Sequence, residues 1–185
     1  MHLTVEAQRI CRDSLFPGAI AIDATAGNGF DTHFLAMHVG DTGFVYAIDI
    51  QPVAMARVQQ RLAEENLSHR VHCVIDSHSH LEQIVAPEHV GQVACVMFNL
   101  GYLPLSDKSI VTCAETTMPA VLAAAKMLRA GGRLSILAYV GQSGGRQEVD
   151  QISKWIAFVP NEFEVERISD SSNPLSPILW SLRRK

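Results

Sequence analysis

The chain has 185 residues, of which 48% are hydrophobic and 18% are charged, so it can build one sizeable core but is too short for two ordinary domains. We therefore expect residues 1–185 to form a single domain. The formal net charge of -4 argues against a protein that coats nucleic acid by charge alone, because neutralising many phosphates requires clustered lysines and arginines.

Two features of the chain favour a cytoplasmic location. Residues 1–6 lack the basic-then-apolar pattern of a signal peptide, and no apolar run approaches the ~18 residues of a membrane span. The cysteines are scattered without a CxxC pair, which is typical of reduced thiols and indicates neither a disulfide frame nor a zinc site. We expect no membrane partner and no metal.

Apolar spacing in the first half of the chain alternates between helical and strand-like. Helical periodicity extends over residues 3–15, 31–39 and 52–66, and short apolar runs predict strands over residues 19–23, 43–49 and 71–76. A brief helix is expected near residues 80–85. The run 92–99 is apolar nearly throughout its middle, which is typical of a central parallel strand.

The second half of the chain continues this alternation. A loop over 100–109 leads to a helix over 115–128, a glycine turn at Gly131-Gly132, a strand over 133–140, a loop over 141–145 and a helix over 146–158. Strands over 162–169 and 178–183 predict an antiparallel hairpin at one sheet edge. Together these elements predict an α/β, Rossmann-like fold with a mostly parallel seven-stranded sheet and helices on both faces.

Four consecutive predicted strands end in an aspartate or an asparagine: Asp23, Asp49, Asp76 and Asn99. The first is followed by Gly27-Asn28-Gly29, a turn that lets backbone approach a ligand closely and precedes a helix N-terminus. Ligands of open parallel sheets bind beyond the carboxyl ends of the strands. Asp49 has the position at which a carboxylate accepts the two hydroxyl groups of a ribose, so the pattern predicts adenosine recognition.

The glycine turn helps to distinguish two nucleoside cofactors. Gly27-x-Gly29 alone fits an ordinary structural turn equally well, and the pattern becomes restrictive only in combination with the strand-end aspartates. Dinucleotide binders carry a third glycine where this chain has Thr32. Asp31 adds negative charge beside the turn, which would repel a diphosphate and suit the ammonium group of a methionine moiety. We therefore expect S-adenosylmethionine, with an NAD(P)-dependent oxidoreductase as the alternative.

Asn99-Leu100-Gly101-Tyr102 follows the fourth strand, where many amine methyltransferases carry an Asn/Asp-Pro-Pro-aromatic tetrapeptide. The Asn99 side-chain oxygen can accept an N–H of a target amine, and Tyr102 offers a face for stacking, so both are candidate catalytic residues. The alternative is that Asn99 caps the turn and Tyr102 covers the core edge. Lys108, in the same loop, suits either a phosphate contact or an ordinary solvated position.

Several stretches resemble the rRNA methylase family of small bacterial proteins, whose characterised members methylate the wobble 5-aminomethyl-2-thiouridine of tRNA. The matching stretches are Asp23-Ala-Thr-Ala-Gly-Asn-Gly-Phe-Asp31-Thr-His33, Tyr46-Ala-Ile-Asp-Ile-Gln51, Met97-Phe-Asn-Leu-Gly-Tyr-Leu-Pro104, Asp107-Lys-Ser-Ile110, Glu115-Thr-Thr117, Tyr139-x-Gly141 and Gly144-Gly145. They are spread over most of the chain. The third and fourth stretches are specific to this family, whereas the glycine turn is shared by many methyltransferases.

The resemblance implies a class I methyltransferase that converts the 5-aminomethyl group of uridine 34 into 5-methylaminomethyl, with S-adenosylmethionine as cofactor and the tRNA anticodon arm as partner. The candidate cofactor-binding residues are Asp23, Ala26, Gly27, Asn28, Gly29, Asp31, His33, Asp49, Gln51, Asp76, Ser77, His78 and Asn99. The candidate substrate-binding residues are Tyr102, Pro104, Lys108, Tyr139, Gly141, Gly144 and Gly145. His33 is explained equally well as a packing residue on its helix.

The chain departs from the family in three places. Leu105-Ser106 stands where relatives tend to have Gly-Gly, Gln142 where they tend to have His, and residues 172–177 are a variant of their Asn-Asn-Pro-Pro turn. Methylation of rRNA, a small molecule or a protein therefore stays as an alternative. His78 and His80 lack a clear third ligand, which argues against a metal site. A homodimer would help so small a chain to span a tRNA arm.

Overall fold

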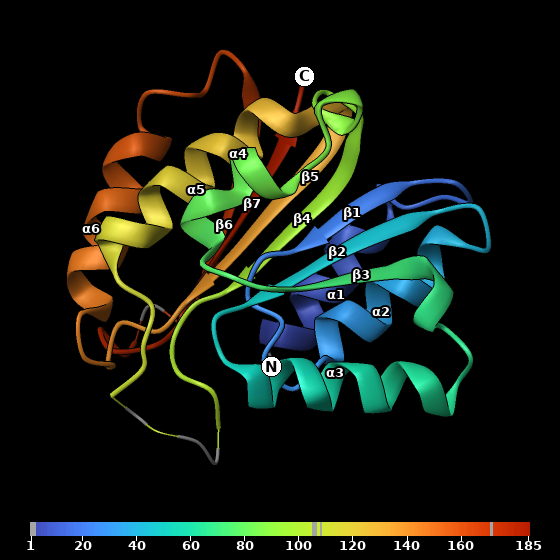
Figure 1. The fold of residues 1–185 in the computed structure, drawn as a ribbon. Coiled ribbons are helices and arrows are strands. Elements are labelled where there is room, and N and C mark those ends of the chain that lie inside the picture. Colours follow the sequence, from blue (N-terminus) through green and yellow to red (C-terminus); the bar gives the residue numbers. More distant parts are fainter. Residues whose placement is uncertain (1–2, 105–106, 108, 171) are drawn as a thin grey trace.

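The computed structural model describes residues 3–104, 107, 109–170 and 172–185. Within these residues the strands form one seven-stranded sheet of order β3-β2-β1-β4-β5-β7-β6 (Figure 1). The strands are β1 (Ile20–Asp23), β2 (Phe44–Asp49), β3 (Val71–Ile75), β4 (Val93–Asn99), β5 (Leu128–Ala138), β6 (Phe163–Ser169) and β7 (Ile178–Arg184). The predicted mostly parallel sheet is confirmed, because only the pairs β5–β7 and β6–β7 are antiparallel.

Helices cover both faces of the sheet, as the sequence predicts (Figure 1). The α-helices are α1 (Leu3–Arg12), α2 (Phe30–Val39), α3 (Pro52–Glu64), α4 (Leu81–Ile84), α5 (Ala114–Met127) and α6 (Gly145–Ile156), and short 3-10 turns span Ser68–Arg70, His78–His80 and Pro87–His89. On one face Ile10, Leu35 and Val58 of α1, α2 and α3 belong to one buried cluster. On the other, Val121 and Ile152 of α5 and α6 belong to a second.

The chain changes direction across the sheet between β1 and β4. From β1 it proceeds outward through β2 to β3, and then returns to the other side of β1 as β4. The register aligns Asp23 with Ala47 of β2 and with Met97 of β4, so the carboxyl ends of these strands lie at one edge of the sheet. This topological switch point is where open α/β sheets bind their ligands.

The expected glycine turn before the fifth strand differs from the observed structure. Strand β5 begins at Leu128, directly after α5, and Leu128 pairs with Val93 before a register shift. Gly131 has a φ of +76°, and a Cβ on Gly132 would lie 2.9 Å from the Val93 carbonyl oxygen. The two glycines therefore permit an irregular start of the strand against β4, where the sequence suggested a separate turn.

Three further observations concern the described part of the chain. No helix found there combines the length and the apolar character needed to cross a membrane. The same residues contain no group of three or more side chains arranged to hold a metal ion. All cysteines are free thiols, with Cys11 and Cys95 buried.

Candidate functional site

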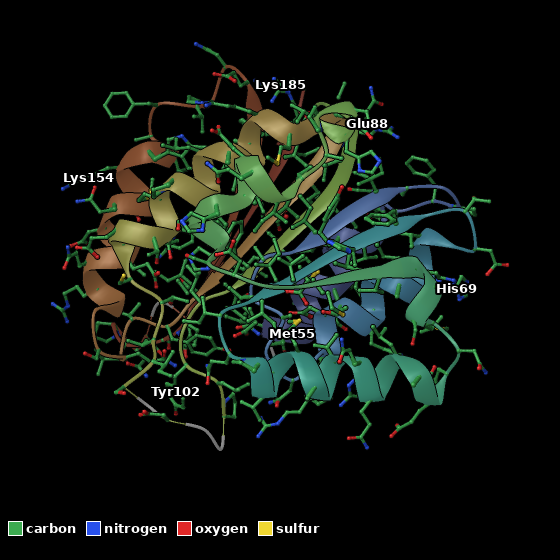
Figure 2. The ribbon with its side chains drawn as sticks, in the orientation of Figure 1. Met55, His69, Glu88, Tyr102, Lys154 and Lys185 are labelled. Carbon is green, nitrogen blue, oxygen red and sulfur yellow. The ribbon has the colours of Figure 1, made fainter. Side chains whose placement is uncertain are left out.

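A cavity of about 510 Å³ opens at the carboxyl ends of the central strands. Figure 2 labels Tyr102 at this edge of the sheet and Glu88 at the opposite edge. Predicted site residues that line the cavity are Ala26, Gly27, Asn28, Asp31, Asp49, Gln51, Asp76, Ser77, His78, Asn99, Tyr102, Pro104 and Tyr139. The structure thus brings together residues from the ends of five strands, β1 to β5, and the volume is that of a small-molecule site.

The glycine turn after β1 is held across the ends of its neighbouring strands. The backbone N–H of Ala26 donates to the Ile48 carbonyl over 2.9 Å, and that of Ala24 donates to the Met97 carbonyl over 2.9 Å. Gly29 precedes α2 with a φ of +80°, and a Cβ there would lie 3.2 Å from Val58. Glycine is needed at this position because the turn passes so close to α3.

Asp49 at the end of β2 is oriented by two backbone amides. Its Oδ2 accepts a hydrogen bond from the N–H of Gly27, and its Oδ1 accepts one from the N–H of Gln51, each over 2.9 Å. Each carboxylate oxygen has further acceptor capacity, so Asp49 can still accept two hydroxyl groups of a ligand in the cavity. The next residue, Ile50, is 52% exposed and provides an apolar surface beside it.

The turn after β3 adds a charged side chain and a neutral one. Asp76 Oδ1 lies 2.8 Å from His80 Nδ1 and accepts from the Ser77 N–H, and these contacts hold the pKa of Asp76 below its ordinary value. His78 is buried, and burial lowers its pKa to about 4, so its imidazole is neutral at neutral pH. Among the described residues nothing hydrogen-bonds to His78 Nε2, which leaves this buried nitrogen for a ligand.

Asp23 does not line the cavity but lies beneath its wall. Its Oδ2 accepts from the Thr32 hydroxyl over 2.6 Å, and its Oδ1 accepts from the Thr25 N–H over 3.2 Å. Burial, together with the nearby Asp31 carboxylate, raises its pKa to about 7. Thr25 also accepts from the Asn99 N–H over 2.7 Å, so Asp23 supports the turn that connects β1 with the end of β4.

Asn99 ends β4, and Tyr102 lies in the loop that follows, which is held by hydrogen bonds on its far side. The N–H of Gly101 donates to the Thr112 hydroxyl over 2.8 Å, the N–H of Thr112 donates to the Gly101 carbonyl over 3.0 Å, and Tyr102 forms a bridge with Val111. Gly101 has a φ of +145°, in the region that favours glycine, and Gln142 packs against it. Asn99 and Tyr102 therefore face the cavity from a fixed backbone.

Glu148 on α6 is a buried acid that supports this loop from below. It accepts hydrogen bonds from the Thr117 hydroxyl over 2.5 Å and from the Thr112 hydroxyl over 3.2 Å. Burial raises its pKa, which these two hydrogen bonds partly offset. A carboxylate in this position points the Thr112 proton toward itself, which leaves the Thr112 lone pairs free to face the Gly101 N–H.

Some predicted site residues lie away from the cavity wall. His33 Nε2 is 3.0 Å from Glu65 Oε2, which joins α2 to the end of α3, and Gly144, with a φ of +74°, caps the start of α6. Gly29, Gly141 and Gly145 are likewise absent from the cavity lining, and their direct contacts with ligands stay predictions. Lys108, Leu105 and Ser106 fall outside the described residues.

Sequence reasoning missed part of the wall. The additional lining residues are Thr4, Ala24, Thr25, Phe30, Ile50, Leu100, Gly101, Leu103, Ile110, Val111, Thr112, Cys113, Thr116 and Gln142. Ile50 could have been predicted from the sequence, because an apolar residue directly after a strand-end aspartate lies beyond the buried part of the strand and is available to line a site. No sequence pattern could have predicted Thr4 and Thr112 in the wall, because their positions depend on where α1 and the loop before α5 pack against the sheet.

The wall suits S-adenosylmethionine in both its chemistry and its size. Asp49 offers two oriented acceptors for ribose, Ile50 offers an apolar face for adenine, and the buried His78 nitrogen lacks a partner in the described chain. Asp31 adds a carboxylate to the wall, which suits an ammonium group. The strand order and this wall at the switch point define a class I, S-adenosylmethionine-dependent methyltransferase.

Comparison with known proteins gives the family. The chain belongs to the family described as "Putative rRNA methylase", whose model matches residues 45–182. It is 38% identical over 171 residues to a protein of Arabidopsis thaliana named tRNA (mnm(5)s(2)U34)-methyltransferase, chloroplastic. That match covers 88% of this chain but only 62% of the Arabidopsis protein, so the chain spans less than two thirds of that relative.

Solved structures of similar proteins cover nearly the whole chain. A Clostridium thermocellum protein that carries the same family description is 33% identical, with a TM-score of 0.92 over 98% of this chain and 97% of that one. A Streptococcus mutans protein, solved in complex with SAH, is 29% identical, with a TM-score of 0.88 over 100% of this chain and 99% of that one. The predicted Rossmann-like methyltransferase fold and the S-adenosylmethionine cofactor are confirmed.

Proposed function

We propose that this methyltransferase acts on tRNA and converts the 5-aminomethyl group of the wobble uridine, in 5-aminomethyl-2-thiouridine 34, into a 5-methylaminomethyl group. The observation that carries the proposal is the shared cavity: Asp49 and His78, which suit the cofactor, line it together with Asn99 and Tyr102, which suit the acceptor. The likeness to the Arabidopsis protein supports this choice of acceptor.

S-adenosylmethionine, when bound, supplies a methyl group on a positively charged sulfur. The acceptor amine must be neutral to attack it: an N–C bond forms as the S–C bond breaks, and the resulting ammonium then releases a proton, to water if no side chain takes it. Asn99 contributes by orientation, because its side-chain oxygen accepts an amine N–H and so directs the nitrogen lone pair. The hydrogen bond from its own N–H to Thr25 fixes its backbone.

The remaining residues bind and orient. Asp49 holds the ribose hydroxyl groups, and Asp31 neutralises the ammonium group of the methionine moiety. Neutral His78 offers its ring nitrogen Nε2 to the cofactor without adding a positive charge to the cavity that holds the sulfonium. Tyr102 stacks on the acceptor base, as aromatic side chains do in single-stranded RNA recognition.

The direct test uses purified protein, S-adenosylmethionine and tRNA from a strain that lacks this enzyme. Nucleoside mass spectrometry should show 5-aminomethyl-2-thiouridine converted to its methylated form, with Asn99→Ala much slower than wild type. The corresponding deletion strain should lose the methylated nucleoside. Unchanged levels in that strain, with no redundant enzyme present, would overturn the proposal.

The family description supports rRNA as a second candidate acceptor. The same assay, run in parallel on rRNA purified from the deletion strain, separates the two candidates. Methyl transfer to rRNA together with no transfer to tRNA would favour rRNA.

A further inference from the structure

A second hollow lies beside the cofactor cavity, on the surface of α3. Its volume is about 300 Å³, and its lining residues are Asn28, Phe30, Arg57, Gln60, Arg61 and Glu64. Asn28 and Phe30 also line the main cavity, so the hollow and the cavity adjoin at the glycine turn. A ligand larger than one nucleotide is long enough to contact both.

The two arginines of the hollow hydrogen-bond only to uncharged acceptors. Arg57 Nη1 donates to Asn28 Oδ1 over 2.8 Å and, more weakly, to the Pro104 carbonyl over 3.4 Å, while Arg61 Nε donates to the Asn28 carbonyl over 3.2 Å. Within the described residues neither guanidinium forms an ion pair, so both stay available to an anionic ligand. Two positive charges thus stand beside the cavity of a chain whose net charge is -4, and the one carboxylate among the lining residues of the hollow, Glu64, accepts a hydrogen bond from Gln60 over 3.1 Å.

An exposed aromatic ring completes the hollow. Phe30 is 59% exposed, and the guanidinium carbon of Arg61 lies 4.2 Å from its ring centroid. A large apolar side chain so exposed at the edge of a ligand site suits a partner with a flat apolar face. Nucleobases stack on aromatic rings and on arginine planes, and phosphates pair with guanidinium groups, so one strand of RNA offers both kinds of contact.

We propose that Phe30, Arg57 and Arg61 form a docking surface for the single-stranded RNA that flanks the acceptor nucleotide. This inference rests on the proposed function in taking RNA as the acceptor. The arginines contact the phosphates of the flanking nucleotides, and Phe30 stacks on one of their bases. Local contacts of this kind allow an acidic chain to bind RNA without a broad basic surface.

The test measures binding of a tRNA anticodon stem-loop by fluorescence anisotropy at several salt concentrations, in the presence of SAH. The double variant Arg57→Gln/Arg61→Gln should bind about 10- to 100-fold more weakly at low salt, and the slope of log affinity against log salt should fall by about 1 to 2. Phe30→Ala should weaken RNA binding about 5- to 100-fold without changing the slope, whereas Phe30→Trp, which retains an aromatic ring, should bind RNA about as tightly as wild type.

Arg129 provides a matched control. Its guanidinium carbon lies 4.8 Å from the ring centroid of Phe16, which is 41% exposed, so it forms a similar arginine–phenylalanine pair. This pair lies near the starts of β1 and β5, at the opposite end of the sheet. Arg129→Gln should leave RNA affinity within about twofold of wild type, because it removes a positive charge that does not contact the RNA and so changes only the net charge of the protein.

Three results would overturn the docking surface. The first is an unchanged RNA affinity in the double variant. The second is a loss of RNA affinity in the Arg129→Gln control as large as that in the double variant. The third is a fall in SAH affinity, measured by calorimetry, in parallel with the fall in RNA affinity. The last result would mean that Arg57 and Arg61 only hold the glycine turn. Methyl transfer by the wild-type enzyme tests the proposed function separately. If wild type methylates tRNA but the variants bind RNA as well as wild type does, the docking surface is refuted and the proposed function is not.

Discussion

Asp49 and Asn99 line one cavity, and the proposed mechanism gives them different roles. Asp49→Ala should weaken SAH binding about 10- to 100-fold, because it removes a carboxylate whose two oxygens are already aimed by the amides of Gly27 and Gln51. Calorimetry of the purified variant measures this loss. Asp49→Asn is the matched variant: it retains one acceptor oxygen and should lose less affinity.

Asn99→Ala should show the converse behaviour. Its turnover should fall about 100-fold or more while SAH affinity stays within about threefold of wild type, because the side chain orients the amine and the backbone contact with Thr25 is kept. Steady-state kinetics and calorimetry on the same sample check both statements. Equal losses of cofactor affinity in Asp49→Ala and Asn99→Ala would contradict this division of roles.

Asp23 predicts a pH dependence of stability in the cofactor-free protein. Its pKa rises from the model-compound value of 3.8 to about 7 in the fold, so between these values the folded protein keeps a proton that the unfolded chain has lost. This contribution to the free energy of unfolding therefore falls as pH rises from about 4 to 7 and is constant above. The physical cause is burial beside Asp31.

Asp23→Asn should remove this dependence, so the variant should gain stability relative to wild type as pH rises from 4.5 to 7. Urea denaturation at a series of pH values measures the difference in the free energy of unfolding between variant and wild type. His78 changes stability with pH in the opposite direction, but both proteins contain it, so its effect cancels in this difference. The exposed Asp150 gives the control Asp150→Asn, whose profile should parallel that of wild type. Parallel profiles for Asp23→Asn would contradict the prediction.

The residues of the site differ in how far the sequence could reveal them. Asp49, Asp76 and Asn99 could be located because each ends a predicted strand, and parallel strands bring their carboxyl ends to one edge. Asp23 shares that pattern, yet the Thr32 hydroxyl and the Thr25 amide hold it below the wall. Gln142 lines the cavity because its loop reaches Gly101, which no local pattern indicates.

At the scale of elements, helix α6 controls the loop that carries Asn99 and Tyr102. Glu148 reaches this loop through Thr112, whose hydroxyl accepts from the Gly101 N–H. Glu148→Gln and Thr112→Val should each destabilise the protein by about 1 to 3 kcal/mol, because each leaves buried polar groups without their partners.

The same two variants should speed hydrogen exchange of the Gly101 amide and lower turnover about 10-fold, with SAH affinity nearly unchanged. Thr112→Ser retains the hydroxyl and should restore slow exchange. Glu115→Gln, an exposed change on α5, is the control for a general effect of lost charge. A protected Gly101 amide in Thr112→Val would refute the connection between α6 and the loop.

The elements themselves could largely be predicted, because apolar periodicity marks each of them. The start of β5 could not: a helix followed directly by Arg129-Ala-Gly-Gly is typical of a turn, and only pairing with Val93 makes it a strand. The sequence predicted the terminal hairpin but not which of its two strands pairs with β5. Burial decides this, because β7 is almost entirely buried whereas β6 is mostly exposed and forms the edge.

At the scale of the whole molecule, the cofactor cavity is lined by elements from both faces and both halves of the sheet. A ligand that binds there only in the folded state should stabilise the entire fold. At a concentration 100 times its Kd, SAH should add about 2.7 kcal/mol to the free energy of unfolding and raise Tm by roughly 5 to 10 °C. Thermal scans check this, and at the same SAH concentration Asp49→Ala should show a smaller rise.

The position of β7 also has a consequence for biogenesis. Helix α1, the first element of the chain, packs on β5 and β7, and β7 is the last element. During synthesis the ribosome therefore releases the helix long before the strand against which it rests. The apolar side of the helix, with Ile10 and Cys11, therefore has only part of its final cover until β7 has been made, and during this interval the nascent protein exposes apolar surface to which a chaperone can bind.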